Sequence, residues 1–257
     1  MYDLSIVLPT CNRAKLLERC LAALWSGVSC DYEIIVVDGA SDDETPGLLK
    51  QASMAFDGRL RVVREASREG FVRAANKGFR AARGRNMIWL NDDARPLGGA
   101  LDEAVRQIDA ADRSVAFLAM YHRCETMRSV AYEKVHRGIT YRLMHVRGTL
   151  YANFPIGKRE TFERLGYFDE GFYLNGADPD LSLKAWDTGL RVVPAQGVCI
   201  DHDEHPDARR AADSDRGNAD NARLFAKWDL PEKNPVRNDF DPATPCTLRG
   251  LRSRKAA

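Results

Sequence analysis

The sequence predicts an α/β protein whose central sheet is mostly parallel and flanked by helices, and three observations support this fold class. In the first 120 residues, short apolar runs typical of buried strands alternate with segments of helical periodicity. Strands that alternate with helices in this way pair in parallel, because each helix returns the chain to the same end of the sheet. Polar residues directly follow three of the apolar runs, at the edge of the sheet where ligands bind in such folds.

The elements of the first half follow from these patterns. Apolar runs predict strands at residues 4–8, 33–37, 60–63 and 86–90. Between them, helical spacing and capping residues predict helices at residues 14–25, from 41–44 to about 55, and at 71–82. In the first of these helices, Leu17, Leu21 and Leu24 recur on one face. The first half therefore has the regular alternation that a doubly wound sheet requires.

The second half is less regular and predicts a mixed arrangement. We expect strands at residues 115–121, 190–193 and 198–200, and helices at 158–165 and 180–188. Residues 125–150 are predicted to form a hairpin or a loop over the site. Residues 203–222 are polar and rich in Asp, Arg and Ala, which favours a mobile segment. No internal repeat and no sharp linker divides the chain.

Composition excludes several classes of protein. The 257 residues carry 38 basic and 37 acidic side chains, for a formal net charge of +1, which argues against a dedicated nucleic-acid binder. None of the 6 cysteines lies in a C-x-x-C pair, which argues against a zinc ribbon. No signal peptide or membrane-length apolar run is visible, so we expect a cytoplasmic protein. The basic tail around Arg249 to Lys255 allows at most peripheral contact with the inner face of the membrane.

Three polar tips are predicted to meet at one edge of the sheet. Pro9–Arg13, Asp38–Asp42 and Asn91–Asp93 follow the first, second and fourth strands. A carboxylate at the second tip can accept a hydrogen bond from a base or a ribose, and the third tip offers hard oxygen ligands that suit Mg²⁺ or Mn²⁺. Such residues are also common in ordinary turns. Their shared place after alternating strands favours a binding site.

Several ordered segments resemble the family 2 glycosyltransferases. They are SIVLPTCNR, YEIIVVDGASDDET, REGFVRAANKGFRAARGRNMIWLNDD, RETFERLGYFDEGFYLNGADPDLSLKAWDTGLRV and FAKW, and the similarity spans about residues 4–228. The resemblance implies a GT-A (Rossmann-like) fold over residues 1–230. Residues 1–95 would bind the nucleotide sugar, residues 96–230 would bind the acceptor, and residues 231–257 would form a C-terminal extension.

The resemblance also implies roles for individual residues. It assigns nucleotide binding to Pro9, Thr10, Arg13, Asp38, Asn76 and Asp92. The last acid of the family's D-x-D motif corresponds to Asp93, which would bind Mn²⁺ or Mg²⁺. In many relatives a histidine at the position of His202 completes the metal shell, and His205 is the alternative here.

The general base is expected at Asp178. The family's ED motif corresponds to Ala177-Asp178, so the glutamate is missing and the aspartate is present. Asp178 would take the proton from the acceptor hydroxyl as that oxygen attacks the anomeric carbon. The alternative is purely structural, because Asp178 as N-cap and Pro179 as first residue would begin a helix without any catalysis. Both can hold together.

The sequence therefore predicts an inverting glycosyltransferase in cell-surface polysaccharide or glycoconjugate synthesis. The donor would be a nucleotide-diphosphate sugar, with UDP favoured and dTDP or GDP as alternatives. The acceptor would be a glycan, a lipid-linked or a small molecule. Two other functions stay open. One is a sugar-1-phosphate nucleotidyltransferase, although Pro9–Arg13 lacks the glycine-rich loop of those enzymes. The other is an inactive nucleotide-sugar-binding protein, which the alanine at position 177 allows.

Overall fold

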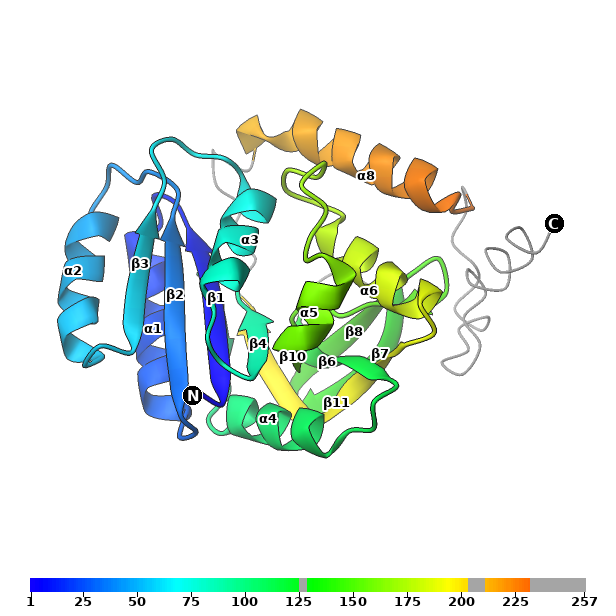
Figure 1. Cartoon of the computed structure of the whole chain (residues 1–257), viewed down its shortest axis with the longest axis horizontal. Coiled ribbons are helices and arrows are strands. Elements are labelled where there is room, and N and C mark those ends of the chain that lie inside the picture. Colours follow the sequence, from blue (N-terminus) through cyan, green and yellow to red (C-terminus); the bar gives the residue numbers. More distant parts are fainter. Residues whose placement is uncertain (125–128, 203–210, 232–257) are drawn as a thin grey trace.

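The parallel sheet of the first half forms as predicted. The computed structural model describes residues 1–124, 129–202 and 211–231 (Figure 1). In it, strands β1 (Leu4–Thr10), β2 (Tyr32–Asp38), β3 (Leu60–Arg64) and β4 (Asn86–Trp89) are parallel, in the order β3-β2-β1-β4. Every residue of β2 is buried, as its continuous apolar run requires.

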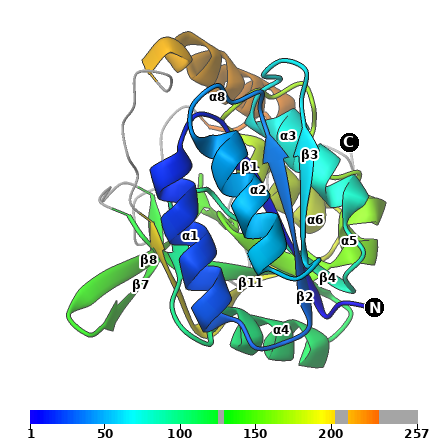
Figure 2. The ribbon, with the colours of Figure 1, turned by 90° about the vertical axis from the view of Figure 1, so that its left-hand side faces the viewer.

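Helices cover both faces of these strands. Figure 2 shows α1 (Ala14–Gly27) and α2 (Thr45–Ala55) on one face and α3 (Phe71–Ala81) on the other. The closest approach is made by α3, where Gly78 lies against β1. A β-carbon at Gly78 would come within 2.3 Å of a side-chain carbon of Val7, so only glycine allows this contact. The predicted capping residue Asp43 accepts a hydrogen bond from the Thr45 N–H at the start of α2.

The second half extends the same sheet with mixed pairing. Strand β10 (Pro155–Lys158) lies antiparallel between β4 and β6 (Val115–Arg123). Next comes β11 (Arg191–His202), which is parallel to β6, and β5 (Ala94–Pro96) pairs with it at the edge. The prediction of two late strands was wrong. The chain instead forms one strand with an irregularity between Pro194 and Cys199, where the pairing with β6 shifts.

Residues 125–150 contain the hairpin that was one of the two predictions. Strands β7 (Val130–His136) and β8 (Ile139–Val146) pair in it, and β8 also pairs with the short strand β9 (Thr149–Leu150). The hairpin projects from the body of the molecule in Figure 2. Its base joins the sheet through pairing of β8 with β6.

The helices of the second half include two that the sequence did not predict. Helix α4 (Ala100–Ala110) packs against β11 and buries Leu101, Val105 and Ile108. Residues 214–222, expected to be mobile, belong to α8 (Ser214–Trp228), which lies across the top of both halves in Figure 1. Of the rest of that predicted mobile segment, residues 203–210 lie outside the described residues.

Helices α5 (Arg159–Leu165) and α6 (Ala177–Asp187) confirm the other two predicted helices. The start of α6 differs from the prediction. Gly176 is its N-cap, in the left-handed conformation with φ of 77°, so Asp178 lies inside the first turn instead of capping it. An acidic residue is still favourable there, because the helix dipole is positive at this end.

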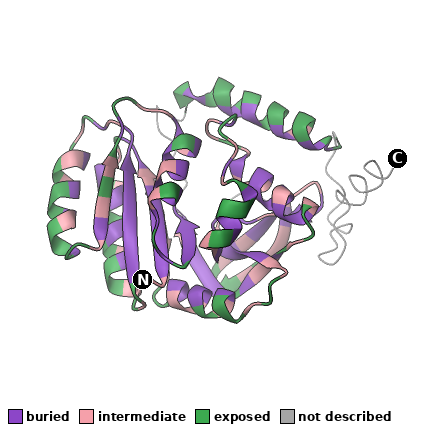
Figure 3. Ribbon diagram, in the orientation of Figure 1, coloured by how far each residue is buried: buried purple, intermediate pink, exposed green. Residues whose placement is uncertain are grey.

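One hydrophobic core joins the two halves. It runs from the strands of the first half to Leu224 and Trp228 of α8, and Figure 3 shows the buried residues continuing through the sheet. Among the described residues, no helix is long and apolar enough to span a membrane. The continuous core holds the carboxyl ends of β1 and β4 in a fixed position relative to the start of α6.

Candidate active site

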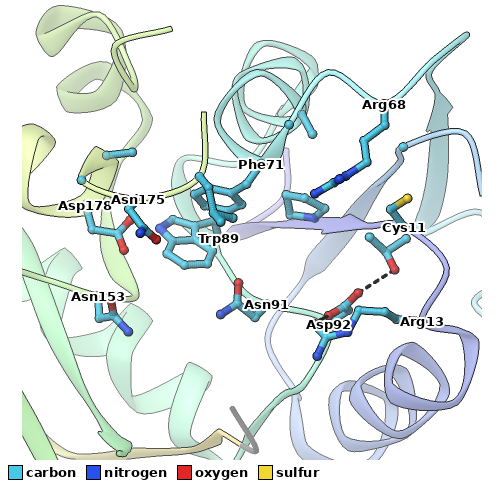
Figure 4. A pocket seen from close by; sticks show the side chains of 18 of the residues that line it. Cys11, Arg13, Arg68, Phe71, Trp89, Asn91, Asp92, Asn153, Asn175 and Asp178 are labelled. Atoms are coloured by element: carbon cyan, nitrogen blue, oxygen red, sulfur yellow. Dashed lines mark hydrogen bonds and ion pairs between the residues drawn. The ribbon is translucent and has the colours of Figure 1, made fainter. Parts of the chain in front are cut away.

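A cavity of about 460 Å³ lies at the carboxyl edge of the sheet, between the two halves. Six of the predicted site residues line it: Pro9, Thr10, Arg13, Asp92, Asp178 and His202. Gly39, which directly follows Asp38, lines it as well. All three predicted tips and the first turn of α6 therefore meet at one cavity (Figure 4). The sequence predicted that these tips would meet, although Asp38 and Asp93 themselves do not line the cavity.

The acids after β4 are held by Arg13. Its guanidinium bonds to Asp92 Oδ1 at 2.6 Å and to Asp93 Oδ2 at 2.8 Å. The hydroxyl of Thr10 donates to Asp92 Oδ2 at 2.8 Å, so Asp92 is fixed from two sides. Because Arg13 and Thr10 both follow β1, the first tip positions the third. Two buried carboxylates can lie this close together because the shared guanidinium offsets their repulsion.

His202 reaches the same cluster from the end of β11. Its Nε2 lies 3.2 Å from Asp93 Oδ1 and 3.0 Å from the amide nitrogen of Asn91. Burial by itself would raise the pKa of Asp93. The hydrogen bond and charge of His202, together with Arg13, outweigh burial and hold the pKa of Asp93 below its usual range. Asp93 is therefore ionised across the physiological range. The alternative residue His205 lies outside the described residues.

The chemistry of this cluster suits the divalent cation that the resemblance implies. Carboxylate oxygens and a neutral imidazole are ligands that Mn²⁺ takes. Within the described residues, however, no three His, Cys, Asp or Glu side chains are close enough together to hold an ion. In this conformation the guanidinium of Arg13 supplies the positive charge between Asp92 and Asp93. A cation ligated by both acids would have to take the place of that guanidinium.

Two residues predicted to bind nucleotide do not line the cavity. Asp38 is buried, where it accepts from the Ser41 N–H at 3.0 Å and pairs with Arg64 at 2.5 Å. Asn76 is fully buried in α3, and its amide exchanges two hydrogen bonds with the backbone of Phe168. The structure thus places Asp38 in the turn that presents Gly39 and uses Asn76 to join the halves. The polar atoms of Asn76 are thus bonded to other partners, and nucleotide binding by Asn76 stays a prediction of the sequence.

Asp178 faces the cavity from the opposite half. Its Oδ1 is shielded from solvent and has no hydrogen-bond partner among the described residues. This burial raises the pKa of Asp178 well above its usual range. Ala177, which replaces the glutamate of the family motif, is buried beside it. Asp178 thus differs from Asp92 and Asp93, because in the described part of the chain no ion pair holds its carboxylate.

Helix α8 fixes the loop that leads to Asp178. The carboxylate of Asp220 accepts hydrogen bonds from three successive backbone N–H groups, those of Tyr173, Leu174 and Asn175, at 2.7 to 3.2 Å. These residues directly precede the N-cap of α6. Trp228 of the same helix donates to Asp180 at 2.8 Å. Because α8 was not predicted over its first half, this support for the site could not be found from the sequence.

A second contact joins α8 to the first half. Arg68 lines the cavity and pairs with Asp213 at the start of α8. The ring of Tyr173 lies near both Arg68 and Arg216, at 5.8 and 4.3 Å. Gly70 is needed here, because its φ is 95° and a β-carbon would come within 2.6 Å of the Tyr173 ring. The cluster fixes the start of α8 beside the cavity, which Asn221 of the same helix also lines.

Other lining residues were missed by the sequence interpretation. Trp89 lies at the end of β4, and Tyr151, Asn153 and Asn175 come from the second half. Figure 4 shows Asn153 and Asn175 on the same side of the cavity as Asp178. The only sequence signal for Trp89 was its place two residues before Asn91. The others lie in segments whose fold depends on long-range contacts.

Solved structures of glycosyltransferases share this fold. A mannosyltransferase of Pyrobaculum calidifontis in complex with GDP-Man and Mn²⁺ has a TM-score of 0.68 and 23% sequence identity, covering 100% of this chain and 76% of that one. TarS of S. aureus in complex with UDP-GlcNAc has a TM-score of 0.62 and 19% identity, covering 79% of this chain and 60% of that one. The predicted GT-A fold is therefore confirmed.

Curated relatives match a shorter part of the chain. Glycosyltransferase AglE of Haloferax volcanii is 31% identical over 106 residues, which cover 40% of this chain and 34% of the relative. A GalNAc(5)-diNAcBac-PP-undecaprenol beta-1,3-glucosyltransferase of Campylobacter jejuni is 30% identical over 107 residues, covering 42% and 35%. The chain thus spans about a third of the length of these relatives. The family model described as Glycosyl transferase family 2 matches residues 5–166, more than half of the chain. The chain therefore belongs to glycosyl transferase family 2.

Proposed function

We propose that this protein is an inverting glycosyltransferase, which moves a sugar from a nucleotide-diphosphate sugar to a hydroxyl group of an acceptor. The observation that carries the proposal is one cavity with two chemically different walls. On one wall, Arg13 and Asp92 lie at the ends of parallel strands, where the donor diphosphate would bind. On the other, Asp178 lines the cavity with a carboxylate whose Oδ1 has no hydrogen-bond partner among the described residues, and it would act as the general base.

The reaction follows from this division. The acceptor hydroxyl gives its proton to Asp178, its oxygen bonds to the anomeric carbon, and the bond from that carbon to the diphosphate oxygen breaks. The raised pKa of Asp178 brings its basicity closer to neutral pH, where proton transfer is most effective. Since the base and the acids of β4 lie on opposite walls, attack from the face opposite the leaving group inverts the anomeric centre.

A divalent cation, Mn²⁺ or Mg²⁺, would be held by Asp93 and His202 and would supply positive charge for the diphosphate. The chain itself supplies Arg13 at the same place. Pro9, Thr10 and Gly39 would contact the nucleotide, since they line the end of the cavity nearest β1 and β2. The carboxylate of Asp38 would act through the turn that it holds.

The relatives support the classes of donor and acceptor. The structural neighbours were solved with GDP-Man and with UDP-GlcNAc, so a nucleotide-sugar donor is proposed here, with UDP first and GDP or dTDP as alternatives. The relative from Campylobacter jejuni is named for an undecaprenol-linked glycan. We therefore propose a glycan, lipid-linked or small-molecule acceptor and a role in glycoconjugate or cell-surface polysaccharide synthesis. A cytoplasmic location with peripheral membrane contact stays a prediction of the sequence.

The experiment measures transfer and hydrolysis of UDP-, GDP- and dTDP-sugars with Mn²⁺. Wild type is compared with Asp178→Asn and Asp93→Ala, and thermal unfolding checks that each variant is folded. We expect one donor to be turned over by the wild type and both variants to lose that turnover. An active wild type whose variants keep full activity would disprove the site. Donor binding without turnover on any acceptor would instead favour the inactive nucleotide-sugar-binding protein.

A further inference from the structure

Trp89 carries a buried donor that has no acceptor. Its side chain is 3% exposed, and its indole Nε1–H finds no hydrogen-bond partner among the described residues. The other two buried tryptophans differ, because Trp186 donates to the Leu150 carbonyl at 2.9 Å and Trp228 donates to Asp180 at 2.8 Å. Buried indole N–H groups normally have such partners. The exception at Trp89 lies in the wall of the cavity.

The indole ring is held in place by aromatic neighbours. Phe71 meets it edge to face at 4.8 Å between centroids, Phe154 lies at 5.1 Å and Phe168 at 6.3 Å. Figure 4 shows the nitrogen-bearing edge of the ring turned toward the side of the cavity where Asp178 lies. A ring packed in this way cannot turn its N–H toward another partner without disturbing the core. The direction of the donor is therefore fixed by the fold.

Two residues that line one cavity thus carry shielded polar atoms of opposite kind, neither of which has a partner among the described residues. Trp89 Nε1 can only donate, and the Oδ1 of ionised Asp178 can only accept. A hydroxyl group complements this pair, since it can donate its proton to the carboxylate while its oxygen accepts from the indole. Neither a carboxylate nor an ammonium group can satisfy both atoms. A neutral hydroxyl group, such as that of a sugar acceptor, therefore fits this pair.

We propose that Trp89 is a positioning residue for the acceptor hydroxyl. This inference rests on the proposed function, in which Asp178 accepts the proton of that hydroxyl. The indole N–H occupies one lone pair of the hydroxyl oxygen and leaves the other directed at the anomeric carbon. When the new carbon–oxygen bond forms, the hydroxyl proton passes to Asp178, the diphosphate leaves with its bonding electrons, and Trp89 keeps its own proton.

The first test is kinetic and compares Trp89→Phe with Trp186→Phe. Each variant keeps an aromatic ring and loses one indole N–H, but Trp186 does not line the cavity. We expect Trp89→Phe to lower kcat/KM for the acceptor roughly three- to tenfold, which is typical of one lost hydrogen bond, and to leave the Kd of UDP unchanged. Trp186→Phe should leave both constants unchanged. Equal effects of the two variants on the acceptor would overturn the proposal.

A second test measures binding to the wild type by NMR and does not depend on transfer activity. In a ¹H–¹⁵N spectrum the indole signal of Trp89 is assigned by elimination from Trp25→Phe, Trp186→Phe and Trp228→Phe. Free glucose, galactose, mannose and N-acetylglucosamine are then added to the wild type in the presence of UDP. We expect at least one sugar to move the Trp89 signal downfield. If UDP binds and no sugar moves it, the proposal fails. If Asp178→Asn keeps full transfer activity, the proposed function itself fails.

Discussion

The two walls of the cavity, one built from β1 and β4 and the other from α6, differ in how their carboxylates are partnered. On the wall built from β1 and β4, Asp92 and Asp93 are held by the guanidinium of Arg13. On the wall built from α6, Asp178 has a shielded oxygen without a hydrogen-bond partner among the described residues. The first arrangement keeps Asp93 ionised, and the second makes the carboxylate of Asp178 more basic. A donor that carries negative charge and an acceptor that must lose a proton require these two environments.

The largest expected effect on activity comes from a change at Asp178, on the wall built from α6. Asp178→Asn removes the proposed base and should lower kcat by at least about 100-fold, as the loss of a general base commonly does. Because the folded state raises the pKa of Asp178, it binds more protons than the unfolded state, and its stability falls as pH rises above the unfolded value. Asparagine removes this penalty. Thermal unfolding between about pH 5 and pH 8 should therefore show a stabilising effect of Asp178→Asn that grows with pH. A pH-independent difference would contradict the shielding of this carboxylate.

A change on the wall built from β1 and β4 should lower the free energy of unfolding. Arg13→Met leaves Asp92 and Asp93 buried without their cation, which should cost about 3 kcal/mol of unfolding free energy without metal. We expect Mn²⁺ to restore more stability in this variant than in the wild type, because the ion no longer competes with the guanidinium. Urea unfolding with and without Mn²⁺ measures both effects. Arg64→Met is the control, since its partner Asp38 lies outside the cavity and Arg64 is half exposed. An equal response to Mn²⁺ in both variants would disprove competition at Arg13.

A smaller loss of stability is expected when α8 no longer holds the loop that precedes α6. Asp220→Ala removes the acceptor of three backbone N–H groups, which should cost about 2 kcal/mol. Hydrogen exchange of the amides at 173–175 should accelerate, and kcat should fall because the loop before Asp178 is less fixed. Asp215→Ala, an exposed residue of the same helix, should change neither. Unchanged exchange in Asp220→Ala would contradict the role of α8.

The smallest effect is expected at Asn76, which the sequence assigned to nucleotide binding and which the structure places against the Phe168 backbone. Asn76→Ala breaks the hydrogen bonds to the Phe168 backbone and should cost about 1.5 kcal/mol. Because Asn76 does not line the cavity, the Kd of UDP measured by calorimetry should stay unchanged. A clear loss of UDP affinity in a variant that keeps its stability would restore the original prediction.

The fold of the first half was predicted almost element by element, and the second half was not. Strands β1, β2 and β4 are almost entirely buried, so each one is a mostly apolar run that stands out from the helices between them. By contrast, β11 contains Pro194 and Gly197 within one strand, which reads as two short strands. Helix α8 has polar residues over most of its surface and depends on contacts such as the bond from Trp228 to Asp180. Patterns along the chain do not reveal such contacts.

The sequence alone determined the family, the parallel sheet and the tips that follow its strands, because parallel strands bring their carboxyl ends to one edge whatever the details of packing. Only the tertiary structure decided which side chains of those tips face the cavity. Asp92 faces it, while Asp38 and Asn76 are turned to backbone and ion-pair partners far along the chain. It also decided that Trp89 lines the same cavity as Asp178. These outcomes depend on burial and on hydrogen bonds between distant segments, and the order of residues does not encode either one locally.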